Sequence, residues 1–63
     1  MKLETTRDIN SFLNIIQELR NETGRFTNYI PTWQVMNCKW IYRKAHNRNE
    51  AKSWIKIELG WDA

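Results

Sequence analysis

The sequence has very few of the residues that build disulfides, metal sites or catalytic centres. Its 63 residues include one cysteine, Cys38, and one histidine, His46. A disulfide within the chain is therefore excluded, and a structural zinc site lacks its four ligands. No acidic cluster has the spacing of a calcium loop, and no glycine-rich loop can cradle a phosphate. We expect no metal and no cofactor.

Catalysis has little support for the same reason. A nucleophilic thiol needs a base within hydrogen-bond distance, and Cys38 with His46 is the one such combination in the sequence. The pattern places Cys38 among apolar residues, where a thiol behaves as a small inert hydrophobe. It places His46 in a polar turn over residues 45–49. The sequence therefore predicts that the protein is not an enzyme and has no catalytic residues.

Long apolar runs are also missing. No segment approaches the ~20 apolar residues that cross a membrane, and residues 1–8 are too polar for a signal peptide. A lone cysteine without a disulfide framework is typical of reducing compartments. We expect a cytoplasmic protein that has no membrane partner.

The small size of the chain limits its core. Residues 1–63 suffice for one domain, and a domain of this size buries only about 60% of the surface of its unfolded chain. A thin core gains stability from any partner that binds the folded state, including a second copy. We therefore expect a single small binding domain, for which self-association is one outcome.

The first segment has the clearest pattern of the sequence. Its apolar residues follow helical spacing over about residues 6–22. They are Ile9, Phe12, Leu13, Ile16 and Leu19, with Ile15 beside them. Thr5 or Thr6 can cap the start of this helix, and Gly24 can end it in a left-handed conformation.

The middle of the chain allows two interpretations. Met36, Cys38, Trp40 and Tyr42 alternate with mostly polar residues, as they would on a half-buried strand. Residues 25–30 also alternate, and Pro31 can begin a turn between the two runs. We favour a β-hairpin. The alternative is a helix over residues 33–45, begun by Pro31 and Thr32.

The last segment could form a helix or a strand, and its end signals favour the helix. The apolar stripe of that helix is Ala51, Trp54, Ile55 and Leu59, with Ile57 on the wrong side, whereas a strand would place Ile55, Ile57, Leu59 and Trp61 on one face. Asn47 can cap its start, with Glu50 as the partner in a capping box. Gly60 can end it, with Trp61 folded back on the last turn. The preferred fold is a small two-layer α+β domain in the order helix, β-hairpin, helix, and the alternative is an all-α three-helix bundle.

Positive charge is concentrated in one stretch. Residues 39–56 carry six basic residues and one acidic residue, whereas the whole chain has a net charge of +3. The basic residues are Lys39, Arg43, Lys44, Arg48, Lys52 and Lys56. In a helix, Arg48, Lys52 and Lys56 would form one ridge. This distribution favours a negatively charged partner. Alternatively, the basic residues form a solvated face whose role is to keep a small protein soluble.

Aromatic residues are the second functional signal. Four tryptophans are many for this length, and we expect at most two of them to be exposed. Tyr29, Trp33 and Trp61 are the rings least tied to an apolar stripe. Because Trp, Tyr and Arg dominate the energetic centres of protein interfaces, these three rings are the candidate anchors for a partner.

Together these patterns predict a non-catalytic protein that binds and regulates or inhibits a larger partner. The expected partner is a protein, or a protein–nucleic acid assembly, with an acidic face. In size the chain resembles small accessory proteins of phages and other mobile elements, which act on host machinery. The alternative function is direct nucleic-acid binding by the basic patch, with aromatic rings stacking on bases.

Overall fold

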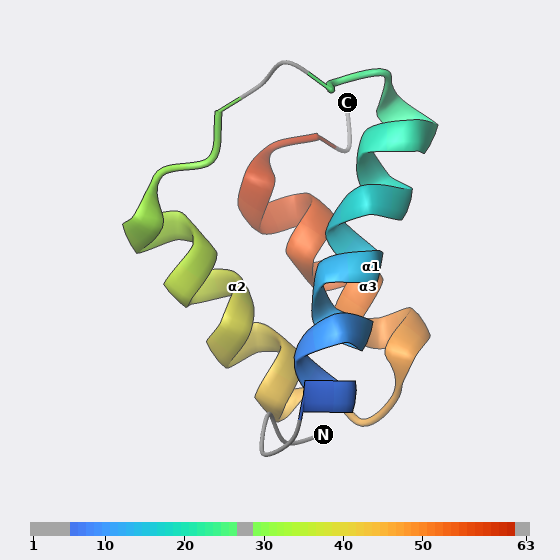
Figure 1. The fold of residues 1–63 in the computed structure, drawn as a ribbon, viewed down its shortest axis with the longest axis vertical. Coiled ribbons are helices and arrows are strands. Elements are labelled where there is room, and N and C mark those ends of the chain that lie inside the picture. Colours follow the sequence, from blue (N-terminus) through green and yellow to red (C-terminus); the bar gives the residue numbers. More distant parts are fainter. Residues whose placement is uncertain (1–5, 27–28, 62–63) are drawn as a thin grey trace.

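The computed structural model describes residues 6–26 and 29–61 (Figure 1). These residues form three α-helices and contain no strand: α1 (Thr6–Thr23), α2 (Thr32–Lys44) and α3 (Arg48–Leu59). α1 and α3 run in the same direction, and α2 runs in the opposite direction (Figure 1). The fold is therefore all-α and resembles a three-helix bundle, with extents of 28 × 20 × 19 Å.

The predicted α+β fold is wrong, because residues 32–44 form a helix and not a strand. In the expected first strand, residues 25–26 and 29–30 have no strand structure, and residues 27–28 lie outside the described part. The helix begins after Pro31, whose carbonyl accepts hydrogen bonds from the amides of Gln34 and Val35 at 3.0 and 3.1 Å. The alternative that we ranked second, an all-α bundle, is the observed one.

The period-two pattern of α2 comes from two interleaved helical stripes. Cys38 and Tyr42 are one turn apart and both are buried, with exposed fractions of 0% and 4%. Met36 and Trp40 are also one turn apart, and both lie on the exposed side of the helix. Two apolar pairs at i, i+4 spacing, offset by two residues, produce the same alternation as a strand.

The predicted signals at the end of α1 and at the start of α3 are confirmed. α1 is followed by Gly24, which has a left-handed φ of 73° and donates to the carbonyl of Arg20 at 2.8 Å. Its expected cap, Thr5 or Thr6, involves side chains outside the described part. α3 starts with Asn47, whose side chain accepts from the amide of Glu50 at 2.8 Å.

α3 ends in a Schellman motif, as predicted. Gly60 has a φ of 73° and donates to the carbonyl of Ile57, and Trp61 donates to the carbonyl of Lys56, both at 3.0 Å. The turn folds Trp61 back into the core, where its exposed fraction is 6%. The guanidinium of Arg20 lies 5.5 Å from the centre of its ring and so joins α1 to this turn.

The core is formed by one face of each helix and by Trp61. Its buried members are Phe12, Ile15, Ile16, Leu19, Cys38, Tyr42, Ala45, Ala51, Ile55 and Trp61. The rings of Phe12 and Tyr42 meet edge to face at 5.7 Å and connect α1 to α2.

The predicted core is correct in part. Phe12, Ile16, Leu19 and Ile55 are buried as expected, and Ile15, expected only beside the stripe, is fully buried. The structure exposes four residues that were expected to pack inside, because the buried faces of α1 and α2 are rotated away from them. They are Ile9, Leu13, Met36 and Trp40, with exposed fractions between 44% and 52%.

We expect Phe12→Ala to destabilise the fold by about 3–5 kcal/mol, because it removes a buried ring and leaves a cavity. A domain of this size has a total stability of only about 3–9 kcal/mol, so the variant should lose a large share of its stability. Leu13→Ala is the matched control, since the half-exposed Leu13 should cost about 1 kcal/mol or less. Urea denaturation followed by circular dichroism measures both, and equal stabilities would contradict the described core.

Candidate binding surface

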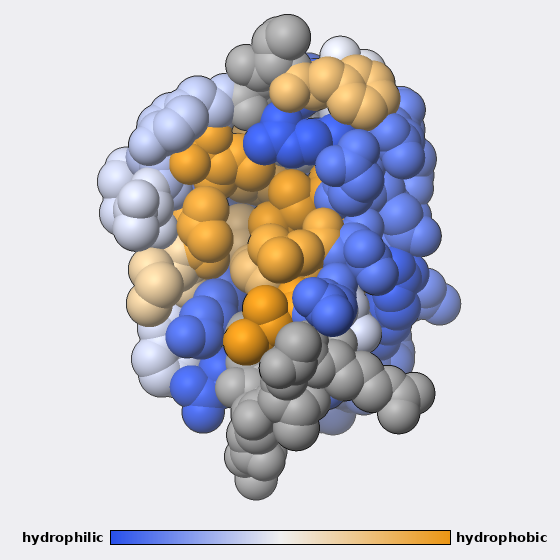
Figure 2. Space-filling model, in the orientation of Figure 1, coloured by the Kyte–Doolittle hydropathy of each residue, from blue (hydrophilic) through white to orange (hydrophobic). Residues whose placement is uncertain are grey.

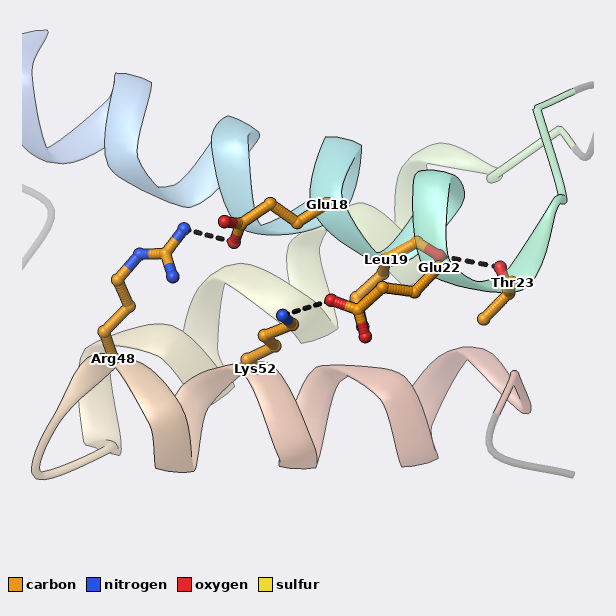
Figure 3. A network of polar contacts seen from close by, with 6 residues as sticks. All are labelled: Glu18, Leu19, Glu22, Thr23, Arg48 and Lys52. Carbon is orange, nitrogen blue, oxygen red and sulfur yellow. Dashed lines mark hydrogen bonds and ion pairs between the residues drawn. The ribbon is translucent and has the colours of Figure 1, made fainter.

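The basic ridge of α3 faces α1. Arg48 pairs with Glu18, and Lys52 pairs with Glu22 (Figure 3). The two carboxylates are one helical turn apart on α1, and the two basic residues are one turn apart on α3. The two parallel helices therefore bring the pairs into register. Most of the ridge thus contributes to the contact between α1 and α3.

The charges at the contact between α1 and α3 affect the pKa of Glu22. A hydrogen bond from Lys52 is the largest cause and lowers the pKa of this carboxyl below its usual range. Desolvation opposes it, and the positive charges of Lys52 and Lys56 lower the pKa further.

The other predicted basic residues lie on α2. Arg43 and Lys44 are exposed in its last turn, and Lys39 is half-buried one turn earlier. No carboxylate of the described residues pairs with Lys39 or Lys44. Besides the ridge on α3, the fold therefore places a second group of basic residues on α2.

Exposed rings lie on the same helix. Trp33 is 63% exposed and Trp40 is 52% exposed, and Tyr29, just before the helix, is 82% exposed. The guanidinium of Arg43 lies 4.8 Å from the centre of the Trp40 ring, which is a cation–π contact. We define the α2 outer face as the residues on the solvent side of this helix: Trp33, Met36, Trp40, Arg43 and Lys44.

The structure brings together some of the predicted partner-binding residues and separates others. One group lies on or beside α2: Tyr29, Trp33, Lys39, Arg43 and Lys44. The other group lies on α3, on the side that faces α1: Arg48, Lys52 and Lys56. Trp61 belongs to the core, so its ring offers no contact surface in this structure.

Three of the four tryptophans, all in the described part of the chain, are exposed, so the expectation of at most two was wrong. The third is Trp54, which is 42% exposed. It lines a shallow pocket of about 320 Å³ between α2 and α3, together with Ile41, Ile57 and Glu58. Trp54 was expected in the apolar stripe of the last helix. The position of Ile57 on the opposite side of that helix was the signal for this surface.

Cys38 and His46, the candidate nucleophile and base, lie in different environments. Cys38 is fully buried, and this burial raises the pKa of its thiol to about 11. His46 lies in the turn before α3 with its ring in solvent, and its Nδ1 is 3.2 Å from a carboxylate oxygen of Glu50. Among the described residues there is no group of three side chains able to hold a metal ion.

The helices were also compared with membrane-spanning helices, and the chain with known proteins. None of the helices in the described part of the chain is long and apolar enough to cross a membrane. No family model, curated protein or solved structure matches this chain.

We expect the thiol of Cys38 to react only when the fold opens. Its raised pKa keeps it protonated at about pH 8, and the core excludes the reagent. Labelling by iodoacetamide should therefore follow the unfolding equilibrium as urea is added, with Cys38→Ala as the unlabelled control. Rapid labelling while circular dichroism still reports intact helices would contradict this placement.

We expect the contribution of Glu22 to stability to disappear in acid. Because its pKa is lowered in the folded state, ionised Glu22 stabilises the fold at neutral pH, and this stabilisation is lost as pH falls through the lowered pKa. The melting temperature of the wild type should exceed that of Glu22→Gln at pH 7, and the two should converge toward about pH 2. A difference that persists in acid would rule out the ion pair as its cause.

Proposed function

We propose that this protein is a non-catalytic binding module that attaches to the acidic face of a larger protein, or of a protein–nucleic acid assembly, and regulates or inhibits it. The contact surface is the α2 outer face. The observation that carries the proposal is the exposure of Trp33 and Trp40 beside basic side chains, on a helix whose opposite face is fully used by the core.

Two exposed indole rings on one helix are costly to leave in water and effective in an interface. Each aromatic ring can bury ~150–250 Å² against a partner, and Trp and Arg dominate the energetic centres of protein interfaces. The stacked Arg43 is already held beside Trp40, so less side-chain entropy is lost when both are buried. Trp33 and Trp40 are therefore the proposed anchors.

The charges around the anchors favour an acidic partner. Lys44 and Arg43 lie at the edge of the outer face, where charges mainly accelerate association and select partners by sign. Arg48 and Lys52 form ion pairs with carboxylates of α1, which partly neutralise their charges. These two residues therefore accelerate association with an acidic partner less than Arg43 and Lys44 do. A reducing compartment, the cytoplasm, suits the single unpaired thiol of Cys38.

Direct nucleic-acid binding is the second candidate, favoured by the stacked pair Trp40–Arg43 next to Lys44. Such a group can stack on a base and contact phosphates. A helix-turn-helix motif would also require an all-helical fold, which this protein has. However, α2 and α3 run in opposite directions (Figure 1), whereas the helices of that motif cross at about 90–120°. We therefore rank protein binding first.

We expect Trp33→Ala and Trp40→Ala each to weaken partner binding by about 2 kcal/mol or more, roughly thirtyfold in Kd, because each removes a central anchor. Trp54→Ala is the matched control, since that ring is exposed on α3 outside the outer face. Quantitative affinity capture from the cells that express the protein, followed by titration of the recovered partner, measures the effect. Equal losses for all three variants would indicate a fold defect and contradict the assignment.

A gel-shift titration of the protein alone at two salt concentrations separates the two candidates. A nucleic-acid site should give affinities that fall by about 0.9 log unit per log unit of salt for each duplex phosphate contacted. We expect no strong shift. Tight, salt-sensitive binding of DNA or RNA that is lost in Lys39→Glu and Lys44→Glu would promote the second candidate over the first.

A further inference from the structure

The bundle is open on the side between α1 and α2. α3 packs against both other helices, whereas α1 and α2 contact each other at few points, among them the ring pair of Phe12 and Tyr42. Figure 2 shows the result: an apolar surface, coloured orange, extends along the space between α1 and α2 and is bordered by hydrophilic residues.

Helical geometry identifies the residues that form this surface. Glu18 and Glu22 mark the flank of α1 that faces α3. Ile9 and Leu13 lie on the opposite flank of α1, and their exposed fractions are 48% and 51%. On α2, Met36 is 44% exposed and lies on the flank that faces away from α3. Ile16 is 8% exposed at the base of the surface. We call Ile9, Leu13, Ile16 and Met36 the apolar seam.

The edge of the seam on α2 is basic. Lys39 and Arg43 follow Met36 on the same flank at spacings of three and seven residues, so they form a row beside the apolar side chains. The seam also adjoins the α2 outer face, because Met36 belongs to both and Arg43 lies at the edge of the seam. Its length is that of α2, about 20 Å for 13 residues.

We propose that the apolar seam is the docking site for an acidic amphipathic helix of the partner, which lies between α1 and α2 as a fourth helix of the bundle. This proposal rests on the proposed function and specifies the partner's element. Its apolar face covers Ile9, Leu13 and Met36, as helices commonly bind in apolar grooves. Its carboxylates face Lys39 and Arg43. The seam accommodates a helix of three to four turns.

The charges argue against the two other obvious occupants. A second copy would bring a chain of net charge +3 against a basic edge, where its own Lys39 would have to approach ours. An anionic membrane would match the basic edge in charge. However, it is a broad flat surface, whereas the exposed apolar side chains of the seam lie between two helices and form a narrow row (Figure 2).

A designed peptide tests the docking site directly. The probe is a fluorescein-labelled helix of about 14 residues with leucines at i, i+3, i+4 and i+7 and glutamates on the flanks. One control is a scrambled peptide of the same composition, and another replaces each glutamate by lysine. Fluorescence polarisation should show binding of the acidic amphipathic peptide at least about tenfold tighter than of either control.

Variants of the protein then locate the binding site. Leu13→Asn and Met36→Asn should each weaken peptide binding about tenfold, and Lys39→Glu should weaken it while improving binding of the lysine peptide. Ile57→Asn is the matched control, because Ile57 is a 61% exposed apolar residue on α3 outside the seam, and it should bind as the wild type does. Chemical shifts of the isotope-labelled protein should change around Leu13 and Met36.

The outcomes are distinguishable from those of the proposed function. No binding up to about 1 mM, equal binding of the lysine peptide, or equal losses in Ile57→Asn would overturn the docking helix. So would tighter binding to vesicles of anionic phospholipid, or a Leu13-dependent dimer in sedimentation. If the recovered partner still depends on Trp33 and Trp40 but not on Leu13, the binding function stands and the docking helix is refuted.

Discussion

The packing of α3 against both other helices is the interaction on which the rest of the structure depends. Ala51 and Ile55 are fully buried at its centre, and the polar pairs with Glu18 and Glu22 align it with α1. At its end, the Schellman turn at Gly60 places Trp61 in the core beneath the guanidinium of Arg20. In a core of so few side chains, this one helix supplies contacts to both neighbours. α1 and α2 are therefore joined mainly through α3 and need not cover each other completely.

The same packing decides which of the basic residues remain accessible. A charge count along the sequence makes residues 39–56 one continuous basic stretch, but the fold divides it in two. The part on α3 faces the carboxylates of α1, where opposite charges offset one another (Figure 3). The part on α2 lies beside exposed tryptophans and an open apolar seam. Positive charge and aromatic rings are thus combined on a single helix, beside uncovered aliphatic side chains of both α1 and α2, and this combination supports the proposed contact surface.

Much of the fold was predictable from the sequence, and the failures have identifiable physical causes. α1 was predictable from the helical spacing of its apolar residues, and α3 from its end signals, Asn47 and Gly60, whose effect does not depend on the rest of the chain. α2 was misread because apolar residues lie all around it, so its pattern lacks one clear face. Of the predicted contact residues, Trp33, Arg43 and Lys44 are exposed, and their role stays a prediction. The pairing of Arg48 with Glu18 and the burial of Trp61 depend on contacts between residues at least 30 positions apart, which a pattern within one segment cannot show.

The unequal lengths of the two connections also set the order in which the bundle can assemble. Residues 45–47 alone join α2 to α3, whereas residues 24–31 separate α1 from α2. A short loop loses less chain entropy on closure, and contacts between neighbouring helices form sooner than contacts that span the chain. The hairpin of α2 and α3 is therefore the kinetically favoured unit, and α1 docks onto it later through Phe12, Glu18 and Glu22. The helix with the exposed tryptophans thus belongs to the part of the chain that acquires its shape first.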